Sequence, residues 1–162
     1  MRRIIVSLAL ALTLVSALIL PAAAAGEQRP VRGEFTGSGV AADQRCGPGS
    51  LTLGFVIRGV TTHLGRLTGS GTNCTEFTLG TEAVSIWDGM ITLEAADGST
   101  LIATYEGEQG QPTGGVATFS HTDTIVGGTG RFDGASGEWT VGGTIDFTDL
   151  TVSGTVSGWL SY

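Results

Sequence analysis

The sequence predicts an all-β fold, an antiparallel up-and-down β-barrel of about eight strands. Apolar residues alternate with Gly, Thr and Ser through most of the chain after residue 25, and no stretch keeps a helical period for three turns. About eight strands in residues 26–162 suit a small closed barrel, because closure leaves no exposed strand edge. An immunoglobulin-like sandwich is the alternative, but no Trp lies between Cys46 and Cys74, where that fold would have one.

Strands are expected where apolar alternation runs between turn residues. These runs cover residues 31–38, 51–58, 60–69, 77–84, 86–95, 101–106, 116–126, 138–147 and 151–160. Between two of them, Ala-Asp-Gly-Ser at 96–99 predicts a tight hairpin, because Gly takes positive φ at no steric cost. A second hairpin is expected near Thr-Asp-Leu at 148–150. Short connections of this kind favour antiparallel pairing of consecutive strands.

The first 25 residues have the pattern of a signal peptide. Arg2 and Arg3 precede an uninterrupted apolar run at 4–20, and small residues at 22–25 satisfy an A-x-A cleavage rule. A membrane-spanning helix is the alternative, but the run is short and no stop-transfer charge follows it. We therefore expect residues 1–25 to be a signal peptide, and 26–162 to form a single barrel domain. The protein would be secreted or held in the cell envelope, with no membrane segment after cleavage.

The charge of the chain argues against two classes of partner. All eight basic residues are Arg, and residues 26–162 hold six of them against fifteen acidic residues, a net charge of −9. Phosphate backbones and anionic lipid surfaces would repel such a chain. We therefore expect no nucleic-acid partner and no binding to a membrane surface. The negative charge is expected to keep the protein soluble.

Cys46 and Cys74 are the only cysteines in the sequence. In an exported protein they predict one disulfide, since oxidising compartments preserve such bonds. A metal pair or a catalytic thiol is the rival hypothesis, but two Cys and two scattered His do not form a ligand spacing. No metal and no other cofactor is expected. Asn73-Cys74-Thr75 also matches a glycosylation acceptor, although so short a pattern often occurs by chance.

The segment 127–137 is the most specific motif in the chain. Its glycines predict a sharp corner between two strands, with an aromatic side chain plugging one end of the core. A phosphate-binding loop does not fit, because the glycine spacing departs from the fingerprint and no helix pattern follows. The residues that we expect to form this structural corner are Gly127, Gly128, Gly130, Phe132, Gly134 and Gly137.

This corner resembles the GGTGxFxxAxG signature of dirigent proteins and the related GGxGxFxG of allene oxide cyclases. It also resembles small secreted bacterial proteins of unassigned function that share the GGTGRF corner and a His-Leu-Gly-Arg stretch, here at 63–66. Their Ala-Asn-Gly-Asp hairpin departs here to Ala-Asp-Gly-Ser. The resemblance covers the last third of the chain well and implies a calycin-like barrel. Because the signature is a structural corner in those families, no catalytic residue is carried over.

His121 and Asp123 are the candidate catalytic residues. Strict alternation along 116–126 places five side chains on one face, namely Ala117, Phe119, His121, Asp123 and Ile125. If this face points inward, the imidazole and the carboxylate meet inside the barrel, where the pair could transfer protons. An outward face, with neither residue having a role, is the alternative.

Candidate ligand-binding residues are His63, Arg66 and Tyr105. His63 is expected on a strand face with Thr61, while Arg66 points the other way. The alternative is structural, with His63 bonded to backbone and Arg66 paired with an acid. The aromatic residues are expected in the core, or one of them in a pocket.

Three classes of function stay open. The barrel could bind a small apolar ligand, which eight strands can accommodate. It could be a cofactor-independent cyclase or isomerase, as the allene oxide cyclase resemblance implies. It could also be a filled barrel with a structural or interaction role in the envelope. A packed interior would argue against the first two, and a buried ionisable pair facing a cavity would favour the second.

Overall fold

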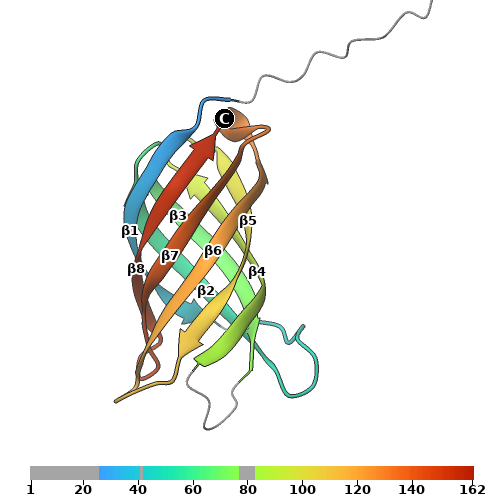
Figure 1. Ribbon diagram of the computed structural model, residues 1–162, viewed down its shortest axis with the longest axis vertical. Coiled ribbons are helices and arrows are strands. Elements are labelled where there is room, and N and C mark those ends of the chain that lie inside the picture. The colour runs from blue at the N-terminus through green and yellow to red at the C-terminus, as the bar shows by residue number, and fades with distance from the viewer. Residues whose placement is uncertain (1–25, 41, 77–82) are drawn as a thin grey trace, which may run out of the picture.

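The structure is a computed structural model that describes residues 26–40, 42–76 and 83–162. Its strands close into an antiparallel barrel in which each strand pairs with the next along the chain and β8 pairs with β1 (Figure 1). The strands are β1 (Arg29–Val40), β2 (Leu51–Thr61), β3 (Gly65–Thr75), β4 (Ala83–Ala95), β5 (Thr100–Gly110), β6 (Val116–Gly128), β7 (Ser136–Asp146) and β8 (Thr151–Ser161). The predicted fold, an eight-stranded up-and-down barrel, is confirmed.

Burial alternates along the strands as the sequence pattern predicts. On β5, Leu101, Ala103 and Tyr105 are buried. Thr104 and Glu106, which alternate with them, are exposed. The inward side chains of the strands form one hydrophobic cluster inside the barrel. The core of this protein is therefore the barrel interior, and the outer surface carries the Thr, Ser and charged residues.

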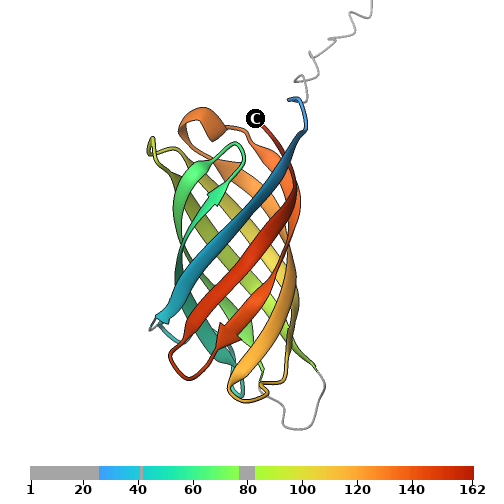
Figure 2. The same ribbon diagram turned by 90° about the vertical axis from the view of Figure 1, so that its left-hand side faces the viewer.

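One end of the barrel is sealed. This end carries the C-terminus and the short 3-10 helix η1 (Gly130–Phe132), as both ribbon views show (Figures 1 and 2). Phe132 and Leu160 are fully buried there. The guanidinium of Arg131 donates to Asp97 Oδ2 at 2.7 Å and to the carbonyls of His63 and Leu64 at 3.2 and 3.3 Å. It thereby links the corner to the β2–β3 and β4–β5 turns.

The Gly-rich corner joins β6 to β7 at this sealed end. Gly130 and Gly134 have φ of +63° and +72°, in the region that favours glycine. Gly128 does not have positive φ; it is needed because a Cβ there would lie 2.4 Å from the Thr100 carbonyl oxygen. The Phe132 side chain plugs the core, as expected from the sequence.

The expected strands at 60–69 and 77–84 do not match the strand bounds of the structure. The expected strand at 60–69 is wrong, because the chain turns at residues 62–64 between β2 and β3. His63 and Gly65 have φ of +68° and +69°, which breaks the extended backbone. The expected strand at 77–84 lies mostly outside the described residues, and β4 begins at Ala83.

The two predicted hairpins are confirmed, and the predicted signal peptide lies outside the described residues. Gly98 turns the chain between β4 and β5 with φ +80°, and Leu150 turns it between β7 and β8 with φ +59°. Within the described ranges, no helix is long and apolar enough to cross a membrane.

Candidate binding cavity

A cavity of about 350 Å³ lies inside the barrel. All eight strands contribute to its wall, and most of the lining side chains are apolar. It includes Val40 at the end of β1, Leu51 at the start of β2 and Leu150 in the β7–β8 connection, so it extends to the end of the barrel opposite η1. We call this end of the barrel the open end. The polar residues that line the cavity are Thr52 and Thr61 on β2, Asn73 on β3, Tyr105 and Gln109 on β5, His121 and Asp123 on β6, and the exposed Glu34 on β1.

His121 and Asp123 meet on the inner face of β6. His121 Nδ1 lies 2.5 Å from Asp123 Oδ1, and Asp123 is only 3% exposed. Trp139 Nε1, from the paired position on β7, donates to Asp123 Oδ2 at 2.9 Å. Both carboxylate oxygens are therefore engaged. Because a carboxylate only accepts hydrogen bonds, Nδ1 carries the proton of this contact and Nε2 is the remaining polar atom of the ring.

The imidazole of His121 is held between two aromatic rings. Its centroid lies 4.5 Å from that of Tyr105 and 5.7 Å from that of Phe119, nearly parallel to the latter. The facing residue on β5 is Gly107, where a Cβ would lie 2.5 Å from the His121 Cβ. The missing side chain thus leaves the space that lets the imidazole lie against the wall. The His121 side chain keeps 14% of its surface exposed and lines the cavity.

Tyr105 lies one step deeper on β5, facing Asp123. Its hydroxyl lies 3.2 Å from Asn73 Oδ1 and 3.3 Å from the Thr72 carbonyl oxygen, both acceptors for its proton. Burial raises the pKa of Tyr105 well above its usual range, and the negative charge of Asp123 raises it further. The phenol therefore stays protonated and neutral at physiological pH.

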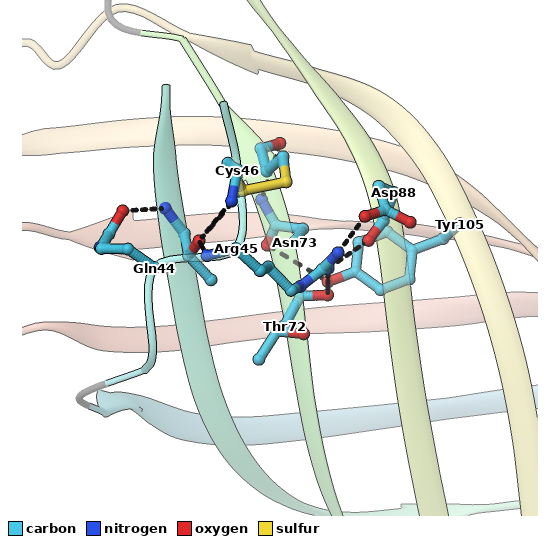
Figure 3. Close-up of a disulfide and its surroundings, with 9 residues drawn as sticks. Gln44, Arg45, Cys46, Thr72, Asn73, Asp88 and Tyr105 are labelled. Carbon is cyan, nitrogen blue, oxygen red and sulfur yellow. Dashed lines mark hydrogen bonds and ion pairs between the residues drawn. A yellow bond between two sulfur atoms is a disulfide. The ribbon is translucent and has the colours of Figure 1, made fainter. Parts of the chain in front are cut away.

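A bulge on β4 makes room for this ring. The register between β4 and β5 shifts between Ile86 and Gly89, and a Cβ on Gly89 would lie 2.5 Å from the Tyr105 ring. Asp88, inside the bulge, has φ +49°. The guanidinium of Arg45 bonds to the Asp88 carboxylate and carbonyl oxygens, as Figure 3 shows. An exposed arginine thereby fastens the bulge from outside the barrel.

The predicted disulfide is present. Cys46 and Cys74 are bonded, and they join the loop that carries Arg45 to the end of β3 (Figure 3). The neighbouring Asn73 is only 7% exposed, and its Nδ2 donates to the Cys74 carbonyl oxygen. An amide buried in this way does not fit a glycosylation acceptor, so that interpretation is wrong.

The other two candidate ligand-binding residues, His63 and Arg66, lie outside the cavity. His63 is exposed in the β2–β3 turn, so the prediction that it shares a strand face with Thr61 is wrong. It contributes its carbonyl oxygen to Arg131, and its ring lies 6.4 Å from that of Tyr162. Arg66 is exposed on β3 and forms no ion pair within the part of the chain that is described. Neither side chain lines the cavity.

Three cavity residues were not singled out as polar site residues from the sequence. Trp139 holds Asp123, and Asn73 accepts from Tyr105. Gln109 is 4% exposed on the cavity wall, and its Nε2 has no hydrogen-bond partner among the described residues. The inward alternation of β5 and β7 was the signal that could have identified Gln109 and Trp139.

The chain matches no protein-family model, and no curated protein is significantly similar to it. Within residues 26–40, 42–76 and 83–162, no three His, Cys, Asp or Glu side chains come together as metal ligands would. The chemistry available in the cavity is that of hydrogen bonding, apolar contact and proton transfer by the His121–Asp123 pair.

Proposed function

We propose that this protein is a small secreted β-barrel that binds a small, mostly apolar molecule in its interior. The observation that carries the proposal is the cavity of about 350 Å³ with its largely apolar wall. Ligand pockets of about 300 to 1,000 Å³ are lined in this way, with a few polar groups that fix the orientation of the ligand. A barrel with a structural role alone could fill this space with side chains, so the cavity favours binding. The disulfide is compatible with secretion.

The open end supports a route of entry. Val40, Leu51 and Leu150 line the cavity there, and each is more than 40% exposed. Apolar side chains left in water at the mouth of an apolar cavity would contact an apolar molecule as it enters. The opposite end is closed by Phe132 and its neighbours. A ligand would therefore enter and leave past Val40, Leu51 and Leu150 at the open end.

Titration with a neutral fluorescent naphthylamine dye tests this proposal. The protein should bind about one dye molecule per chain, with increased emission from a dry environment. Val141→Trp adds a large side chain on the inner face of β7 and should weaken binding at least tenfold. Val126→Trp is the matched control, because Val126 is 58% exposed on the outer face of β6. Absence of dye binding, or an equal loss in both variants, would contradict the proposal.

A cofactor-independent isomerase or cyclase is the second candidate, and the His121–Asp123 pair favours it. The imidazole contacts the cavity, and a buried carboxylate orients it, which is the arrangement of a general base. His121 Nε2 would take a proton from one atom of the bound molecule and return it to another. If a compound retained from culture extract is converted, and His121→Phe stops the conversion without loss of binding, the enzyme hypothesis replaces the carrier.

A further inference from the structure

We infer that the ligand of this cavity is an uncharged molecule whose hydroxyl group donates a hydrogen bond to His121 Nε2. This inference rests on the proposed binding function and specifies the chemistry of the ligand. Two features of the cavity carry it. One is the charge of the lining residues, and the other is the polar atom that the His121–Asp123 pair leaves free.

The charge of the wall argues against anionic ligands. No Lys or Arg lines the cavity among the described residues. Asp123 already places a carboxylate in the wall, and Arg45 is engaged with Asp88 outside the barrel. A ligand carboxylate or phosphate would lose its water and gain no fixed cation in return, which is costly in an apolar cavity.

The same wall argues against cationic ligands. Both oxygens of Asp123 are occupied, by His121 and Trp139, and the side chain is buried behind them. An ammonium group carries three donors and needs three acceptors. Of the His121–Asp123 pair, only His121 Nε2 is left to a ligand, and it offers one lone pair. Glu34, the other acidic residue that lines the cavity, is exposed to water on β1. An ammonium group bound at Nε2 would therefore have two donors that the pair does not satisfy.

The free nitrogen selects a donor. Nδ1 of His121 is committed to Asp123, and Nε2 makes no hydrogen bond within the described part of the chain. In a neutral imidazole with its proton on Nδ1, Nε2 is an acceptor. A hydroxyl meets this acceptor with one hydrogen bond and no charge.

Displacement of the neutral naphthylamine dye by four matched compounds tests the inference. Octanol and heptyl methyl ether are isomers, of which only octanol can donate. Octanoate and octylammonium carry the two charges. Octanol should displace the dye at about three- to tenfold lower concentration than the ether, as one hydrogen bond to a buried acceptor predicts. Both ions should be at least tenfold weaker than octanol.

A double variant tests whether His121 causes the preference for octanol over the ether. In the double variant His121→Phe with Asp123→Asn, the ring is kept and the buried carboxylate is not left unpaired. Dye binding should persist, and the octanol-to-ether ratio should fall to about one. His63→Ala, which changes the exposed imidazole, should leave the ratio unchanged. Independently of any variant, octanol should shift the nitrogen NMR signal of His121 Nε2 and not that of His63.

The outcomes separate the two proposals. If the wild-type protein binds no dye, the proposed function fails and this inference falls with it. If the dye binds but octanoate or octylammonium displaces it better than octanol, the inference alone is overturned. It is equally overturned if the ether matches octanol, if the ratio persists in the double variant, or if octanol leaves the His121 signal unmoved.

Discussion

The Cys46–Cys74 disulfide should supply a large share of the stability of this barrel. It closes a loop over a sequence separation of 28 residues. On the chain-entropy description, a cross-link of this span raises the free energy of unfolding by about 3 to 4 kcal/mol, because it restricts the unfolded chain. The total free energy of unfolding of a small domain is about 5 to 15 kcal/mol. Reduction should therefore remove about a fifth or more of the stability.

Urea unfolding followed by tryptophan fluorescence measures this contribution. For a small domain, the free energy of unfolding falls by about 1 to 3 kcal/mol per molar urea. The double variant Cys46→Ser with Cys74→Ser should thus lower the urea midpoint by about 1 to 4 M. Arg45→Ala is the matched control in the same loop. Its ion pair with Asp88 is largely exposed and contributes about 1 kcal/mol or less.

Two results would refute this reasoning. If the cysteine variant and Arg45→Ala shift the midpoint equally, the loop is held by its contacts and not by the disulfide. If the unfolded, unreduced protein contains two free thiols per chain, the bond does not form at all. The expected count is zero, since Cys46 and Cys74 are the only cysteines and the structure pairs them.

Other substitutions test the corner, the site and the turns. Gly130→Val should lower the melting temperature by about 5 to 10 °C, because Gly130 has positive φ, whereas His63→Ala at the exposed turn should lower it by less than about 3 °C. Trp139→Phe should cost about 1 to 3 kcal/mol in urea unfolding, because a buried carboxylate loses its donor. The backbone N–H of Ser99 lowers the pKa of Asp97 below 3.8, so the stability gained from this carboxylate is complete above about pH 4 and lost at lower pH. Melting curves from pH 2 to 6 should show a smaller acid loss for Asp97→Asn than for wild type.

The fold could be predicted because each strand keeps one apolar face and each hairpin has a recognisable turn. The β4–β5 hairpin has Gly98 where positive φ is needed. The β2–β3 turn was missed because the apolar residue Leu64 continues the alternation through it. In the structure this side chain is buried at the sealed end, between two residues of positive φ. Of these two, Gly65 was the available signal, while His63 adopts the same region without being glycine.

The candidate site could be predicted in part. Alternation placed His121 and Asp123 on one face of β6, but it could not say which face pointed inward, because that face mixes apolar and polar residues. The partners on other strands depend on register. Tyr105 reaches Asn73 only because a bulge on β4 shifts the pairing. Ile86 and Ile91 are both buried, although an odd spacing of five residues would place them on opposite faces of a regular strand. This odd spacing of two apolar residues is the sign of the bulge in the sequence.

Register also connects the 127–137 corner to the candidate site. Asp123 on β6 faces Trp139 on β7, and the corner with η1 is the direct connection between these two strands. A slip of one residue in this pairing would turn the inward side chains of β7 to the outer surface, since the side-chain period of a strand is two. Trp139 would then leave the carboxylate, and the carboxylate would no longer be held in place against the imidazole. The corner touches none of the polar groups in the cavity, yet its length and its glycines determine whether His121 presents Nε2 to a ligand.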